Sequence, residues 1–90
     1  MDRSALPGED LILAGIDDLR RGDESVPALL VSIGASRLER VGYRVPTPIS
    51  SPELKLYDVL AREDPDAAHS RYNALLSRLV SFERAAECAR

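Results

Sequence analysis

The sequence predicts an all-α fold: a single compact domain of four helices over residues 1–90, with a long C-terminal helix as its spine. Apolar residues recur along 64–90 at alternating spacings of four and three, which is the period of an amphipathic helix. Aromatic residues make up only 4% of the chain, and strand-forming residues never alternate over a useful length. Proline and glycine stand where helices would begin and end.

The first helix is expected at about 7–21. Pro7 suits a first helical turn, and Gly22 follows the last turn as a stop signal. The side chains expected in the core are Ile12, Leu13, Ile16 and Leu19. Gly15 lies in the middle of this helix, where glycine costs about 1 kcal/mol relative to alanine. We therefore expect Gly15 at a close helix crossing.

The second helix is expected to run without interruption over about 26–41. Ser25 is its predicted N-cap, and Pro27 lies in the first turn. The expected core side chains are Leu29, Leu30, Ile33, Leu38 and Val41. Gly34 lies inside this helix as Gly15 lies inside the first, and we expect the two glycines to face each other.

Residues 42–51 form the longest connection, in which Val45 and Thr47 each precede a proline and are pushed towards extended geometry. A stiff linker of this kind can cross the end of a helical bundle. We expect Tyr43, Val45 and Ile49 to anchor it to the core, rather than to form a ligand-binding loop.

The third helix is expected at 52–63, with Ser51 as its N-cap and Pro52 in its first turn. Its expected core residues are Leu56, Tyr57 and Leu60, with Leu54 and Ala61 as further candidates. Because Pro65 disfavours helical geometry at Asp64, a sharp corner should lead into the last helix, at 65–88.

The last helix carries a long apolar stripe, formed by Ala68, Tyr72, Leu75, Leu79, Phe82, Ala86 and Ala89 and widened by Leu76 and Val80. This helix would be about 38 Å long, against about 17–24 Å for its neighbours. We therefore expect Ala68–Val80 to be covered by the other helices and Phe82–Ala89 to project past them. Exposed apolar stripes mark protein interfaces. The predicted interface residues are Tyr72, Leu75, Leu79, Phe82 and Ala86.

The charge balance makes a nucleic-acid partner an alternative rather than the first expectation. The net charge is −3, from 12 basic and 15 acidic residues, and this balance opposes affinity for phosphate. A helix-turn-helix regulator would need a turn near Gly34 and a recognition helix at 36–41 that carries Arg37 and Arg40.

A second alternative involves the single histidine. Arg62 precedes His69 with six residues between them, and Pro65 lies within that interval. An arginine followed by a histidine at this kind of spacing resembles the all-helical HEPN family of ribonucleases and toxins. The resemblance implies that Arg62 and His69 would polarise a phosphate and assist attack by a ribose 2′-hydroxyl.

Other chemistry is not indicated. One histidine and one cysteine, Cys88, do not make a metal-site pattern, and no phosphate-binding or nucleophile motif occurs. No apolar run reaches the ~18 residues that a membrane span needs, and a lone cysteine gives no disulfide framework. We therefore expect a cytoplasmic, non-enzymatic module without cofactor or small-molecule ligand that binds a protein partner or forms a homodimer.

Overall fold

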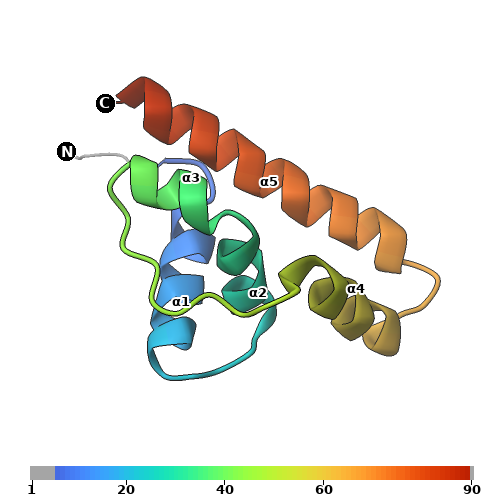
Figure 1. Cartoon of the computed structure of the whole chain (residues 1–90). Coiled ribbons are helices and arrows are strands. Elements are labelled where there is room, and N and C mark those ends of the chain that lie inside the picture. The colour runs from blue at the N-terminus through green and yellow to red at the C-terminus, as the bar shows by residue number, and fades with distance from the viewer. Residues whose placement is uncertain (1–5, 90) are drawn as a thin grey trace.

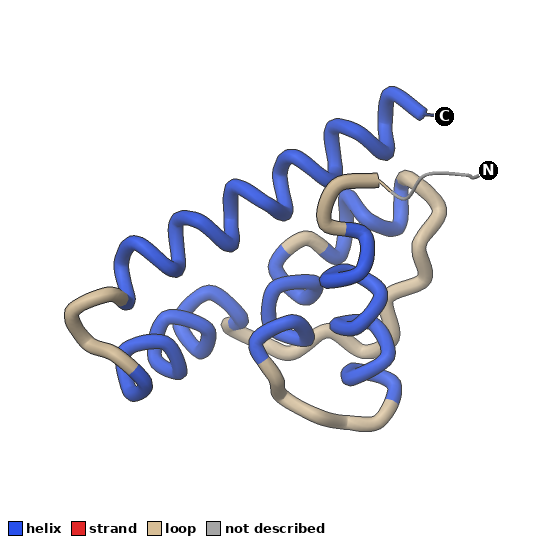
Figure 2. The backbone as a smooth tube through the Cα atoms, turned by 180° about the vertical axis from the view of Figure 1, so that it is seen from behind, coloured by secondary structure: helices blue, strands red, loops and turns tan. Residues whose placement is uncertain are grey.

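Every regular element in the computed structural model, which describes residues 6–89, is a helix. The helices are α1 (Glu9–Arg20), α2 (Val26–Ile33), α3 (Ala35–Arg40), α4 (Pro52–Glu63) and α5 (Ala68–Ala89). At about 1.5 Å per residue α5 is roughly 33 Å long, and the whole molecule extends 40 Å along its longest axis. The shorter helices lie along one side of α5, with α4 beside its N-terminal half and α3 beside its C-terminal half (Figures 1 and 2). The predicted all-α fold with a C-terminal spine is confirmed.

The central helix of the core is α2, which contacts α1, α4 and α5. Its sequence is apolar around most of its circumference, as expected of a helix surrounded by others, and the run from Ala28 to Val31 is at most 1% exposed. The crossing of α1 over α2 depends on Gly15. A Cβ atom at this position would lie 2.3 Å from the carbonyl oxygen of Pro27. The close crossing predicted at Gly15 is confirmed.

The prediction of one uninterrupted helix over 26–41 is wrong, because the helix breaks at Gly34. This residue has φ −95° and ψ 13°, and it separates α2 from α3. A Cβ atom here would lie 2.6 Å from Oε2 of Glu83 and 3.0 Å from Cδ1 of Leu79, so α5 passes directly over the break. Gly34 therefore faces α5, and the expectation that it faces Gly15 is also wrong. The break is caused by tertiary packing against α5, which the helical period of the sequence does not indicate.

The connection over 42–51 crosses the core as expected. Val45 is buried, and Tyr43 and Ile49 pack against the core cluster. Ser32, a buried polar residue of α2, fixes the far end of the connection. Its hydroxyl donates to the carbonyl oxygen of Ala28 at 2.9 Å and accepts from the backbone N–H of Ile49 at 3.0 Å. One side chain thus satisfies its own hydrogen-bonding groups and holds the loop on α2.

The helix starts match the predicted caps only in part. Ser25 caps α2, its Oγ accepting from the N–H of Ala28 at 3.2 Å. Ser51 precedes α4 but makes no capping bond, and its φ of 49° places it in the left-handed region. At the α4–α5 corner the backbone oxygen and Oδ1 of Asp64 both accept from the N–H of Ala67, at 3.1 and 3.3 Å. This turn delays the start of α5 by three residues relative to the prediction.

Candidate functional site

The apolar stripe of α5 is covered as far as Ala86, so the prediction that Phe82–Ala89 projects past its neighbours is wrong for Phe82 and Ala86, although Ala89 is exposed. Phe82 is completely buried, and Leu79 and Ala86 are 3% and 4% exposed. The prediction assumed that the shorter helices lie side by side from one end of α5, and they do not. They meet it at successive points along its length (Figure 1). Three of the five predicted interface residues therefore belong to the core of this chain.

Tyr43 and the start of α1 supply the cover over Phe82. The Tyr43 ring lies edge-on to the Phe82 ring with 5.4 Å between centroids. Its hydroxyl donates to Oε2 of Glu9 at 3.0 Å. Burial raises the pKa of the Tyr43 phenol, and the hydrogen bond to Glu9 acts in the same direction. Through Tyr43, the 42–51 connection thus contacts both the first helix, at Glu9, and the last helix, at Phe82.

A buried carboxylate lies beside this cover. Glu83 is 3% exposed, and its Oε1 lies 3.4 Å from Nη1 of Arg37, whose Nη2 lies 3.1 Å from Oε2 of Glu87. Burial raises the pKa of Glu83, the positive charge of Arg37 opposes that rise, and Glu87 adds to it. The space for the carboxylate exists because Gly34 has no side chain. This cluster holds α3 on α5.

The exposed apolar side chains gather elsewhere, along the side that α4 and α5 share. We call Leu54, Tyr57, Tyr72, Leu76 and Val80 the α4–α5 apolar surface. Leu54 is 75% exposed, Tyr57 39% and Val80 36%. Tyr72 and Leu76 are half-buried.

One ring contact between the two helices, and the helical spacing along each helix, connect these five residues. The Tyr57 ring lies 5.4 Å from the Tyr72 ring, centroid to centroid. Tyr72, Leu76 and Val80 follow one another at four-residue intervals and so lie on one helix face. Leu54 and Tyr57 are three apart and share a face of α4 for the same reason.

The predictions that Leu13, Tyr57 and Val80 lie in the core, with Leu54 as a further candidate, are wrong, because all four side chains are exposed. The sequence did contain one signal for Leu54, because it lies off the stripe formed by Leu56 and Leu60 at i, i+4. Nothing comparable marked Val80, whose spacing from Leu76 fits a wide covered face equally well. The fourth predicted interface residue, Leu75, is half-buried. Only Tyr72 belongs both to the predicted interface and to the α4–α5 apolar surface.

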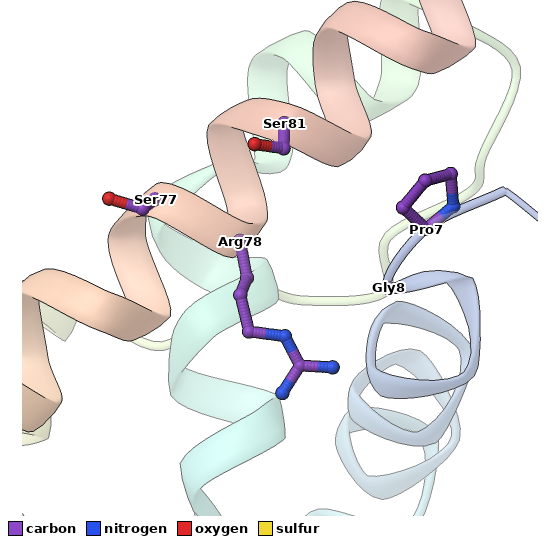
Figure 3. A pocket seen from close by; sticks show the side chains of 5 residues that line it. All are labelled: Pro7, Gly8, Ser77, Arg78 and Ser81. Atoms are coloured by element: carbon purple, nitrogen blue, oxygen red, sulfur yellow. The ribbon is translucent and has the colours of Figure 1, made fainter.

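Three of the hollows on the surface formed by residues 6–89 are open to solvent. One of about 470 Å³ runs along α5 past Leu76, Val80 and Arg84, and so extends the α4–α5 apolar surface. A second, of about 280 Å³, lies between the start of α1 and α5. In Figure 3, Arg78 extends beside the start of α1, while the hydroxyls of Ser77 and Ser81 point away from Pro7. The third, of about 440 Å³, is bordered by Glu39, Gly42, Tyr43 and Arg44. None brings an acid–base or nucleophile pair together.

The two residues of the HEPN resemblance are engaged separately. Arg62 is exposed and its Nη2 lies 2.8 Å from Oδ2 of Asp58. Nε2 of His69 lies 3.2 Å from Nδ2 of Asn73, and its ring lies 6.5 Å from that of Tyr57. No hydrogen bond or ion pair joins Arg62 to His69 in the part of the chain that the structure describes. The geometry adds no support to a ribonuclease site.

The helix-turn-helix alternative finds both of its helical elements, with a break at Gly34 and α3 close to the position expected for the recognition helix. α3 has only six residues. Arg37, one of its two candidate contacts to DNA, is engaged with Glu83 and Glu87. A guanidinium held between two carboxylates contributes little to binding a phosphate backbone.

Residues 6–89 contain no group of three His, Cys, Asp or Glu side chains that could hold a metal ion. None of the helices described is long and apolar enough to cross a membrane. Comparison with known proteins gives no relative: no family model, curated protein or solved structure matches this chain.

Proposed function

We propose that this chain is a non-enzymatic helical interaction module that self-associates through the α4–α5 apolar surface. One observation carries the proposal: Leu54, a large apolar side chain, is 75% exposed and adjoins other exposed apolar groups on the same two helices. Single exposed apolar residues are normal on protein surfaces, whereas contiguous patches mark interfaces. Leu13 of α1, 49% exposed, is an example of the isolated kind.

The rest of the molecule supports a binding role. The five helices are held by a continuous core, so the α4–α5 apolar surface is presented on a rigid frame. Its few residues suit a weak, concentration-dependent contact, since obligate interfaces are much larger. As part of the proposal we place the module in the cytoplasm, where a free exposed thiol such as Cys88 remains reduced.

Sedimentation equilibrium over a wide concentration series tests the proposal. The wild-type chain should show a reversible monomer–dimer equilibrium, and Leu54→Glu and Val80→Asp should each shift it towards monomer. Leu13→Glu is the matched control, because it adds the same charge at an exposed apolar position on α1. A chain that stays monomeric at every concentration would overturn the proposal. So would equal weakening by the control variant.

Phe82→Asp, which the sequence alone makes an attractive interface test, is unsuitable. It would place a charge in the core and report on folding rather than on association.

A further inference from the structure

The charges that border the α4–α5 apolar surface indicate how two copies would pack. Glu53 lies one turn before Tyr57 on α4, and Arg84 lies one turn after Val80 on α5, each at a four-residue interval. Both side chains are exposed, and neither forms an ion pair with any residue between 6 and 89. The apolar surface therefore has an acidic border on α4 and a basic border on α5.

Several other charges near this surface are already paired. Asp58 pairs with Arg62 on α4, and Glu63 of α4 pairs with Arg71 of α5 at 3.2 Å. Glu87, at the far end of α5, is held by Arg37. Glu53 and Arg84 are thus two opposite charges that border the surface and have no ion-pair partner among residues 6–89.

The antiparallel course of α4 and α5 (Figures 1 and 2) sets the spacing of these groups. Tyr57 of α4 contacts Tyr72 of α5. Because the helices are antiparallel, Leu54, one turn before Tyr57, lies level with Leu76, one turn after Tyr72. Leu76, Val80 and Arg84 then follow at intervals of about 6 Å. Leu76 lies level with Leu54 and the acidic border. Val80 therefore lies midway along α5 between the acidic border and Arg84.

We infer that two copies pack about a two-fold axis beside Val80, which brings Arg84 of each copy to Glu53 of the other. This inference rests on the proposed self-association and specifies its geometry. Rotation by 180° about an axis at Val80 exchanges the acidic and basic borders, so one contact forms two identical ion pairs. Val80 meets its own copy at the centre, and the aliphatic stem of Arg84 covers Leu54 and Leu76 of the second molecule. Such a contact is closed and stops at the dimer.

Charge reversal tests the geometry. Glu53→Arg alone and Arg84→Glu alone should each weaken the dimer about tenfold at low salt, because two exposed pairs turn from attractive to repulsive. An equimolar mixture of the two variants should recover wild-type association, since a mixed dimer carries only opposite-charge pairs. Glu39→Arg and Arg44→Glu are the matched controls, changing net charge equally away from the surface. Melting monitored by circular dichroism verifies that every variant is folded.

The outcomes separate the inference from the proposed function. A wild-type dimer that responds to Leu54→Glu but not to the two reversals would leave self-association standing and overturn this packing. Reversals that weaken the dimer without recovery in the mixture would overturn it as well. So would a mixture that assembles beyond the dimer, because a closed two-fold contact cannot extend. A wild-type chain that never dimerises would remove both proposals.

Discussion

Replacing Gly15 with alanine should destabilise the protein, although the same change stabilises most helices. In the interior of a helix, alanine is favoured over glycine by about 1 kcal/mol. At Gly15, however, the new Cβ would lie 2.3 Å from the Pro27 carbonyl oxygen, 2.7 Å from its carbon and 2.8 Å from Cγ1 of Val31. Two of these atoms are backbone, so no side-chain rotation relieves the contact. The α1 and α2 helices must move apart.

The size of the effect follows from two opposed contributions. Overpacking a close-packed core costs about 1–3 kcal/mol and occasionally more, and the contact with the Pro27 backbone is severe enough to belong at the upper end. After subtracting the propensity gain, we expect a net loss of about 1–2 kcal/mol. For a domain of this size that corresponds to a fall of about 4–16 °C in melting temperature.

Urea denaturation of wild type, Gly15→Ala and Ala14→Gly measures this effect. Ala14 is the exposed neighbour in α1, so Ala14→Gly reports the propensity difference alone and should lose about 1 kcal/mol. The decisive quantity is the sign for Gly15→Ala. If that variant is as stable as wild type or more stable, α1 and α2 do not cross as closely as described.

The remaining predictions concern α5. Phe82→Ala should lower the free energy of unfolding by about 3–5 kcal/mol, because it removes a fully buried ring and leaves a cavity. Val80→Ala at the surface should change the free energy of unfolding by less than about 1 kcal/mol. Similar losses for the two variants in urea titrations would contradict the assignment of Phe82 to the core. Glu83 should make stability depend on pH. Because burial raises its folded pKa, the folded state holds this proton more tightly, so wild type should lose stability relative to Glu83→Gln as the pH rises from about 4 through the raised pKa. Wild type gaining on the variant over that interval would show that the ion pair with Arg37 outweighs burial.

Local sequence signals determined much of this fold. The amphipathic period over 64–90 indicated the long C-terminal helix. Proline and glycine located the outer ends of the other helical segments to within a few residues, but not the break at Gly34. The Ser25 cap and the anchors at Tyr43, Val45 and Ile49 were also predicted. These features depend on each residue's own conformational preferences and on neighbours within about four positions, which a sequence displays directly.

The tertiary structure alone decided which apolar side chains remain exposed. The stripe of α5 is equally regular at Phe82 and at Val80, yet the first is buried and the second is 36% exposed. The difference arises because Tyr43, 39 positions earlier in the chain, reaches one of them and no helix covers the other. The break at Gly34 and the burial of Glu83 have the same origin, since each depends on where α5 crosses α3. Such crossings are set by packing between distant segments, and no local pattern along the chain records them.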